Sequence, residues 1–545
     1  MFRRSTPAKG FINILSSETS DVWFPPSTMA LLPYHIDSVL LVGLAALIVH
    51  SFIQRRTNTA RLPVPPGPPP LPVIGNLLDL PVAAEPWKAY AGLSQRYGDV
   101  VHLSVFGQTI IILSSLEAIS DLFEKRSTIY SSRPHSTMLH ELMGMDWSLA
   151  IMPYGEEWRK VRRGFHQYFN SNVAPNYHTV HEEQSHDFLK RLRQTPEDFL
   201  DHIRHAFAAT IMKVTYGIEV KDADNEYIHL AENAIIGFNA AAQPGRFLVD
   251  SFSPLRYVPA WMPGADFQRL AAHWKEVGLQ MLNKPFDAVK SAVASGSAVP
   301  SVASDMIEHI LSSPDREEQE AIARRSAGIA YVGGADTTIS AVSSFFLAMA
   351  MYPEVQKKAQ AELDAVVGPN RLPTFADRPS LPYIEAIVKE ILRWKLVTPM
   401  SVPHCTSADD EYRGFFIPKG SVVFAAAWSI LHNPVEFPDP ESFNPDRFLK
   451  DGKLNPDVLD PTVACFGFGR RICAGRYFAL NQLYSTVATV LHIFNISPAL
   501  DDKGHPIPVE PHMSSGIVSY PEPFKCNIKP RSPAADALTK ESHHE

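Results

Sequence analysis

Cysteine is scarce in this chain, and the few cysteines are not arranged as a disulfide framework or a zinc site. Cys405, Cys465, Cys473 and Cys526 are the four cysteines among 545 residues, and no two of them form a C-x-x-C pair. So few thiols do not make a disulfide scaffold, and a zinc ribbon needs the missing pairs. The histidines show no H-E-x-x-H spacing. These absences favour a reduced, cytosol-facing domain.

An excess of positive charge and a glycine-rich dinucleotide motif are also missing. The formal net charge is −8 at pH 7, so bulk electrostatics argue against nucleic acid as a partner. No flavin or Rossmann glycine fingerprint occurs in the sequence. Any chemistry that draws electrons from NADPH therefore requires a separate reductase.

One long hydrophobic run stands near the N-terminus. Residues 36–53 are apolar apart from four positions, and as a helix they would span roughly 27 Å, close to the hydrocarbon thickness of a bilayer. A buried core helix is the alternative, but no globular sequence precedes this segment for it to pack against. Three arginines follow within residues 55–61, and the positive-inside rule then places residues 1–35 in the lumen and the remainder in the cytosol. We expect a single-pass protein of the endoplasmic reticulum membrane.

The sequence after this helix predicts a hinge, one large domain and a tail. Residues 54–76 are basic and then proline-rich, which predicts a stiff, extended hinge; a ligand for an SH3-type domain is the alternative. Residues 77–530 contain no repeat and no low-complexity boundary. Helical periodicity is common there and strand-like stretches are few, so we expect a single, mainly α domain with a minor β part. Residues 531–545 predict a disordered, solvated tail.

The ten-residue stretch FGFGRRICAG surrounds Cys473 with glycines and arginines directly before a helical-looking segment. Free backbone N–H groups at a helix start favour an anion, so the position predicts a thiolate of lowered pKa. Gly469 and Gly475 allow a close approach of the loop and an unusual backbone conformation. Arg471 adds a cation two residues from the sulfur, and Phe466 can cover the sulfur from water. Taken alone, such a cysteine is better explained as a small buried residue.

The pattern F-x-x-G-x-R-x-C-x-G formed by these residues resembles the haem-binding loop of the cytochrome P450 superfamily. The resemblance runs from the proline-rich segment to Cys526 and implies the cytochrome P450 fold, with one large catalytic domain. It implies haem b as the cofactor, the Cys473 thiolate as the axial ligand of the haem iron, and Phe466 and Gly469 as parts of the binding loop. Local stretches such as MPYGEEWRKVRR look most like P450s of fungal secondary metabolism, from basidiomycetes.

A second motif, GGADTT, occupies residues 333–338 inside a helical run that Pro353 closes. Two adjacent glycines in a helix cost on the order of 1 kcal/mol each relative to alanine, which a loosened groove for a diatomic ligand would offset. Hydrogen bonding of the Thr337 hydroxyl back to the helix backbone is the alternative explanation. The motif matches the oxygen-activation motif of the family, and this match implies that Thr337 and Asp336 deliver protons during oxygen activation.

Further motifs extend the resemblance. The pair Glu390 and Arg393, followed by Arg447, implies a buried structural network behind the haem. Trp158 and Arg162 are four residues apart and therefore share one helix face. By the resemblance, the side chains that hold the haem propionates through charge-assisted hydrogen bonds are Trp158, Arg162, His404, Arg471 and Arg133.

We expect a membrane-anchored, haem-thiolate monooxygenase that takes NADPH-derived electrons from NADPH-cytochrome P450 reductase and oxidises an apolar substrate, foremost a terpenoid intermediate. A polyketide or an aromatic or indolic substrate is the alternative. A haem-thiolate isomerase or dehydratase usually lacks an acid–threonine pair such as Asp336-Thr337. A non-catalytic haem or sterol carrier gives no reason for two helix glycines beside a threonine hydroxyl. The resemblance places five residues at the open face of the haem: Ala330, Ala335, Val397, Met400 and Ile517. It places a docking surface for the electron donor, or else a solvated helix face, at Arg159, Lys160 and Arg163.

Overall fold

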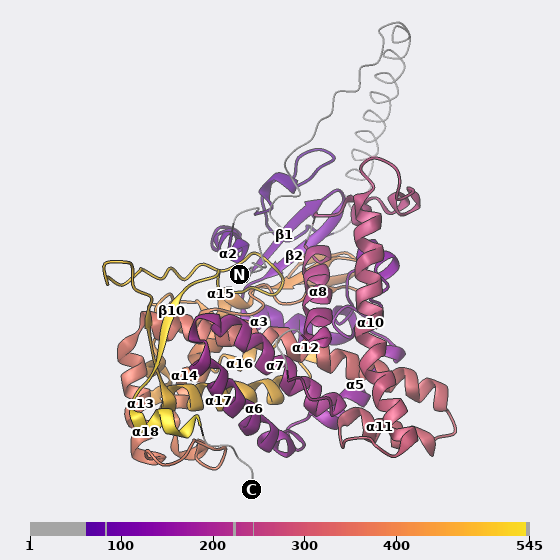
Figure 1. Cartoon of the computed structure of the whole chain (residues 1–545). Coiled ribbons are helices and arrows are strands. Elements are labelled where there is room, and N and C mark those ends of the chain that lie inside the picture. Colours follow the sequence, from indigo (N-terminus) through magenta and orange to yellow (C-terminus); the bar gives the residue numbers. More distant parts are fainter. Residues whose placement is uncertain (1–61, 82–83, 222–224, 244, 541–545) are drawn as a thin grey trace, which may run out of the picture. The chain divides into compact units, whose positions relative to one another are not determined.

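The computed structural model describes residues 62–81, 84–221, 225–243 and 245–540, which form a mainly helical domain with a small β part, as the sequence predicts (Figure 1). The predicted lumenal segment, residues 1–35, and the predicted membrane helix, residues 36–53, lie outside the described residues. Within the described part of the chain, no single helix is both long and apolar enough to cross a membrane. Helices α12 and α13 reach that length and composition only as a pair bent by 104°.

Helices make up most of the domain. The longer ones are α2 (Pro86–Tyr97), α5 (Glu156–Phe169), α6 (His178–Gln194), α7 (Phe199–Tyr216), α8 (Glu226–Ala241), α10 (Asp266–Ser295), α11 (Val302–Leu311), α12 (Arg316–Met351), α13 (Pro353–Val366), α14 (Pro382–Trp394) and α17 (Arg476–Ile493). The short ones are α3 (Leu116–Ile119), α4 (Ser127–Tyr130), α9 (Leu248–Ser251), α15 (Ala427–Leu431), α16 (Thr462–Cys465) and α18 (Pro533–Leu538).

The β part consists of one four-stranded sheet and three hairpin-like pairs. Its strands are β1 (Val100–Val105), β2 (Gln108–Leu113), β3 (His404–Cys405), β4 (Asp410–Tyr412), β5 (Phe415–Ile417), β6 (Val422–Ala425), β7 (Leu449–Lys450), β8 (Lys453–Leu454), β9 (Phe494–Pro498) and β10 (Cys526–Pro530). The sheet has the order β1-β2-β6-β3, with β2 and β6 parallel and the outer pairs antiparallel. Strand β3 carries His404, so the sheet fixes the position of this predicted site residue.

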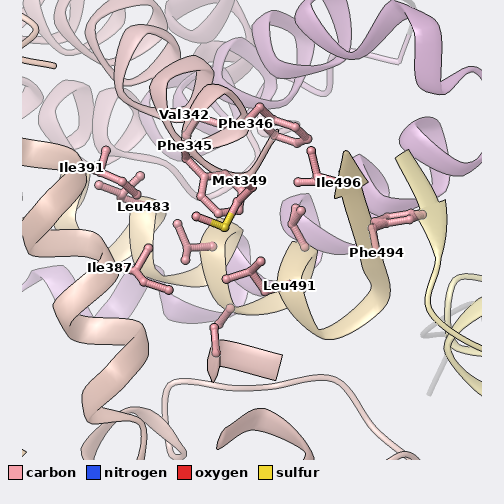
Figure 2. Packing of buried hydrophobic residues seen from close by; sticks show 14 of the residues in the cluster. Val342, Phe345, Phe346, Met349, Ile387, Ile391, Leu483, Leu491, Phe494 and Ile496 are labelled. Carbon is pink, nitrogen blue, oxygen red and sulfur yellow. The ribbon is translucent and has the colours of Figure 1, made fainter. Parts of the chain in front are cut away.

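Helix α12 is the centre of the packing and contacts α5, α7, α8, α10, α11 and α17. Its residues 338–350 are all buried, because apolar or small side chains occupy every face of that part of the helix. Figure 2 shows Phe345 and Met349 of α12 among Ile391 of α14 and Leu483 and Leu491 of α17. Each such side chain stabilises the fold by about 1.5–3 kcal/mol when fully buried. The core therefore fixes α12 relative to α17, the two helices on which site motifs lie.

The predicted network of Glu390, Arg393 and Arg447 is present and buried. Arg393 donates two hydrogen bonds to the Glu390 carboxylate, at 2.7 and 2.8 Å, and both side chains are fully buried. Arg447, on the 3-10 helix Pro445–Phe448, donates from Nε to the same carboxylate at 3.2 Å. The remaining Arg393 donors reach backbone carbonyls of Leu431 and of residues 440 and 442. A buried charge cluster is tolerated when its hydrogen bonds are satisfied in this way.

The predicted boundaries at both ends of the domain need correction. Residues 62–70 of the predicted hinge form no helix or strand, whereas residues 71–76 form a turn closed by a bridge between Leu71 and Gly75, so the predicted extended conformation is wrong there. The hinge is also bound to the domain: the Pro63 carbonyl accepts a hydrogen bond from the Phe416 N–H at 2.8 Å, and the Pro66 carbonyl accepts one from the His102 N–H at 2.8 Å. The domain therefore starts before residue 77. At the other end, Pro533–Leu538 form helix α18 with buried Ala535 and Leu538, so the disordered tail predicted from residue 531 is wrong up to residue 540. Residues 541–545 lie outside the described residues.

Candidate active site

The loop around Cys473 joins the 3-10 helix Gly469–Arg471 to the start of α17. The Cys473 N–H donates to the Phe466 carbonyl at 2.8 Å and closes the loop. Gly469 has a φ of +55°, and a Cβ there would lie 2.1 Å from the Phe123 carbonyl oxygen, so only glycine fits. The unusual backbone conformation predicted for Gly475 is wrong, because its φ is an ordinary −89°. A Cβ on Gly475 would meet no described protein atom closer than 4.0 Å, but the residue lines the cavity, so its close approach to a flat partner stays a prediction.

Cys473 faces a cavity of about 330 Å³ that lies between its loop and α12. The side chain is exposed, and because it lines the cavity this exposure is toward the cavity. Within the described residues there is no cluster of three or more His, Cys, Asp or Glu side chains that could hold a metal ion. A metal in this cavity would therefore need ligands from outside the described chain, which suits an iron most of whose ligands belong to a macrocycle.

Burial raises the pKa of the Cys473 thiol. The Gly475 N–H and the charges of Arg162 and Arg476 act in the opposite direction but are outweighed. The lowered pKa that the sequence predicted is therefore wrong, because the sulfur at this helix start is desolvated. A bound metal cation deprotonates a coordinating thiol outright, so the N–H and the arginines would then stabilise the thiolate.

The opposite wall of the cavity is the middle of α12, and its two adjacent glycines have different surroundings. A Cβ on Gly333 would meet nothing within 4 Å, whereas a Cβ on Gly334 would lie 2.9 Å from Ile211 of α7. The Thr337 hydroxyl donates to the Gly333 carbonyl at 2.8 Å, which is the backbone bonding considered as the alternative. Helix α12 runs unbroken through this point, so the predicted loosening of the helix is not seen. Gly333 leaves open space beside Thr337, and Gly334 allows close helix packing.

Asp336 does not line the cavity, although the neighbouring Thr337 does. Its carboxylate accepts a hydrogen bond from the hydroxyl of Tyr520, in the C-terminal part of the chain. Burial raises the pKa of Asp336 to about 6, and the bond from Tyr520 opposes this shift. Sequence reasoning missed Tyr520, because the two residues are 184 positions apart and no local pattern connects them.

A polar rim surrounds one side of the cavity, and three of its five members are arginines. Its members, which are also the predicted propionate-binding residues, are Trp158, Arg162, Arg133, His404 and Arg471. Arg471 donates to the backbone carbonyls of residues 131, 149 and 152 at 2.7, 3.1 and 2.8 Å. Arg133 donates to the carbonyls of residues 150, 402 and 403 at 2.7, 2.7 and 2.8 Å. His404 is held at Nδ1 by the Tyr130 carbonyl at 2.7 Å and stacks on Phe123.

The charges of this rim have no counter-ion among the residues that the structure describes. Burial lowers the pKa of Arg133 to about 9 and, together with repulsion from Arg133 and Arg162, lowers the pKa of Arg471 to about 8. Burial also holds the pKa of His404 well below its ordinary value. Isolated buried cations are costly unless an anion pairs with them. The residues therefore fit a flat, apolar cofactor that carries carboxylates on one edge and a metal above the Cys473 thiol.

The structure places the other predicted residues as follows. Phe466 lines the cavity, but Gly469 does not, because it shapes the loop from outside. Of the five residues expected at the open face, Ala330 and Val397 line the cavity. The remaining three do not line it: Ala335, Met400 and Ile517. Ala335 is instead buried in a core cluster, and Met400 packs beside the sheet.

Comparisons with known proteins agree with this geometry. A family model described as cytochrome P450 matches residues 65–528. The chain is 46% identical over 502 residues to cytochrome P450 monooxygenase COX2 of Coprinopsis cinerea, a match that covers 92% of this chain and 94% of the relative. It is 44% identical over 517 residues to cytochrome P450 monooxygenase 98 of Postia placenta, with 94% and 98% covered. It is 42% identical over 500 residues to tryptamine 4-monooxygenase of Psilocybe cyanescens, with 91% and 98% covered.

Fold, site and relatives define a haem-thiolate monooxygenase, in which the cavity above Cys473 is the haem site. The chain belongs to the cytochrome P450 family, and its relatives are monooxygenases of basidiomycete fungi, as the local sequence stretches predicted.

Proposed function

We propose that this protein is a membrane-anchored monooxygenase of secondary metabolism that oxidises a neutral, apolar substrate, foremost a terpenoid. Its electrons come from NADPH through NADPH-cytochrome P450 reductase at the endoplasmic reticulum membrane. The observation that carries the substrate class is the lining of the cavity. On the α12 side of the cavity, opposite Cys473, the lining residues are apolar or small and uncharged, and none of the described lining residues of the cavity is Asp or Glu.

The absence of carboxylates from the described lining of the cavity also favours a terpenoid over an indolic amine as the substrate. One relative is named for its action on tryptamine, which is protonated at neutral pH. A buried ammonium group is costly without a carboxylate partner, and the described lining of the cavity offers none. A neutral substrate avoids this cost and gains free energy from apolar burial.

Different residues of the chain would bind the cofactor, orient it and hold protons beside it. The thiolate-ligated haem supplies the splitting of O₂ and the transfer of one oxygen atom to the substrate. Cys473 binds the iron, and the arginines of the rim orient the cofactor through its carboxylates. Thr337 lines the cavity beside the open space at Gly333, and its hydroxyl would hold a proton on that side of the cavity. Asp336, one residue earlier, is the proton donor behind it.

The docking proposal for the reductase is narrower than the sequence indicated. Arg159 and Arg163 of α5 are exposed. Lys160 is engaged by Glu318 of α12 at 2.5 Å and by two further carboxylates of α5. We therefore assign the docking contacts to Arg159 and Arg163. The double variant Arg159→Glu/Arg163→Glu should slow reductase-driven reduction and leave chemical reduction unchanged, and equal rates with the reductase would contradict this assignment.

The substrate proposal is tested on the full-length chain in microsomal membranes with the reductase. Neutral terpene hydrocarbons and alcohols, aromatic polyketides and tryptamine are titrated in turn, and the haem absorption and NADPH consumption are recorded. We expect a neutral terpenoid to change the absorption at the lowest concentration and to give an oxygenated product. Tighter binding and turnover of tryptamine would contradict the proposal.

The membrane anchor is tested separately by washing the membranes with alkaline carbonate, which removes proteins that are only bound to the membrane surface. The chain should stay in the membrane pellet, and its release would contradict the predicted anchor at residues 36–53.

A further inference from the structure

The C-terminal segment around Tyr520 is attached to α12 at two points one helical turn apart. Tyr520 donates from its hydroxyl to the Asp336 carboxylate. The preceding residue, Ser519, accepts at its backbone carbonyl a hydrogen bond from the Ser340 hydroxyl. Asp336 and Ser340 are four residues apart and so lie on the same face of the helix. Thr337 projects about 100° away from Asp336 around the helix axis and faces the cavity.

The segment that carries Tyr520 is itself held in a fixed conformation. The Ser514 N–H donates to the Tyr520 carbonyl at 2.8 Å, and the Tyr520 N–H donates to the Ser514 hydroxyl oxygen at 3.0 Å. The N–H of the fully buried Ser519 donates to the Val397 carbonyl at 2.8 Å. The phenol is thus delivered to Asp336 by a rigid loop, as a preorganised contact requires.

Charged and polar groups of α7 and α8 face the same carboxylate from the other side. Arg204 of α7 and Glu232 of α8 both act on Asp336, and they lie 3.7 Å apart with side chains 44% and 39% exposed. Asn239 of α8 lies beside Tyr520, and its Oδ1 is buried without a hydrogen-bond partner in the described structure. A buried polar atom of this kind is commonly satisfied by a water molecule. Asp336 is therefore next to Thr337 of the cavity wall and under the influence of two charged side chains that are partly exposed to solvent.

We propose that Tyr520 is a positioning residue that holds the Asp336 carboxylate toward Arg204, Glu232 and Asn239. Protons from solvent then enter between α7, α8 and the C-terminal loop, reach Asp336 and pass from it to Thr337. The inference rests on the proton role assigned to Asp336 and Thr337 under the proposed function. A purely structural tie between loop and helix is the competing explanation, and Ser340 provides its control, because Ser340→Ala removes the other attachment point without touching the carboxylate.

The first test measures the ionisation of Asp336 in the full-length, haem-loaded protein and needs no substrate. The carboxyl band of Asp336 is assigned in infrared spectra by its loss in Asp336→Asn and is followed against pH. Tyr520→Phe removes a hydrogen bond to the ionised form, so the midpoint should rise by about one pH unit. Ser340→Ala should leave the midpoint unchanged. An unmoved midpoint in Tyr520→Phe, or an equal shift in both variants, would overturn the proposal.

The second test keeps the proposal falsifiable if Tyr520→Phe binds no haem. Arg204→Gln removes an exposed cation that favours the ionised Asp336, and it should also raise the midpoint; no shift would overturn the route. The amount of hydrogen peroxide released per NADPH oxidised distinguishes a failure of the proton role of Asp336 from a failure of the route through Tyr520 and Arg204. If Asp336→Asn releases no more peroxide than the wild type, the proton role of Asp336 fails and the route fails with it. If Asp336→Asn raises peroxide but Tyr520→Phe and Arg204→Gln leave both readouts unchanged, the route alone fails.

Discussion

Glu390→Gln is the perturbation whose consequence follows most directly from the geometry. The carboxylate accepts from Arg393 twice, from Arg447 at 3.2 Å and from the Asn444 N–H at 2.8 Å, and it is fully buried. Glutamine in its place has no negative charge, and its side-chain NH₂ group would face N–H groups of Arg393, Arg447 and Asn444, which are also hydrogen-bond donors. Removing one partner of a buried ion pair costs about 3–5 kcal/mol because the other charge stays buried without compensation. A domain is stabilised by about 5–15 kcal/mol in total, so this loss is a large share.

The assay for Glu390→Gln is the amount of thiolate-ligated haem per milligram of purified chain, together with the half-life of that signal on warming. A half-life is the suitable quantity because large proteins of this kind unfold irreversibly. Asp266→Asn is the matched control, since Asp266 and Arg269 have the same i,i+3 spacing but 73% and 60% exposed side chains. Exposed pairs contribute about 0–1 kcal/mol. We expect severe loss in Glu390→Gln and little change in the control; a half-life of Glu390→Gln within twofold of the wild type would refute the reasoning.

Three further predictions test separate features of the site. Gly469→Ala should abolish haem loading because its Cβ would lie 2.1 Å from a carbonyl oxygen, whereas Gly92→Ala, at an exposed position of α2 where a Cβ meets nothing within 4 Å, should load normally; equal loading in both would contradict the loop geometry. Thr337→Ala should keep the haem but raise the hydrogen peroxide released per NADPH oxidised several-fold, and full coupling would contradict its role. Asp336→Asn should have a longer half-life on warming than the wild type at neutral pH. The pKa of Asp336 in the folded protein, about 6, exceeds the ordinary value of 3.8. Ionisation of Asp336 therefore destabilises the folded wild type, whose stability falls as the pH rises from 3.8 through about 6. A half-life ratio that does not change between pH 4.5 and 8 would contradict this.

The parts of the site that sequence reasoning predicted are those in which a local spacing already determines the geometry. Trp158 and Arg162 share a helix face because they are four residues apart, and both line the cavity. Glu390 and Arg393 meet because they are one turn apart on a buried helix. The environment of Cys473 was predicted only in part. The sequence shows that Cys473 precedes a helix, which lowers the pKa of a thiol. It does not show how far the surrounding side chains desolvate the sulfur, and this desolvation outweighs the effect of the helix start.

The features that sequence reasoning missed depend on contacts between distant segments. Tyr520 meets Asp336 across 184 positions, and only the folded chain brings them together. Leu538 is buried under α17 and α6 in a segment whose composition looked solvated. Gly333 and Gly334 look alike in the sequence, but only the second packs against α7. Local propensity identifies such residues as unusual, and the tertiary partner decides what they do.

Coordination of the haem iron by the sulfur of Cys473 is the central claim, and one spectrum tests it directly. The full-length chain is purified after growth with a haem precursor, reduced and exposed to carbon monoxide. We predict the absorption band typical of thiolate-ligated haem in the wild type and its absence in Cys473→Ala. A colourless wild-type protein, an imidazole-type spectrum, or a thiolate band that persists in Cys473→Ala would contradict the account.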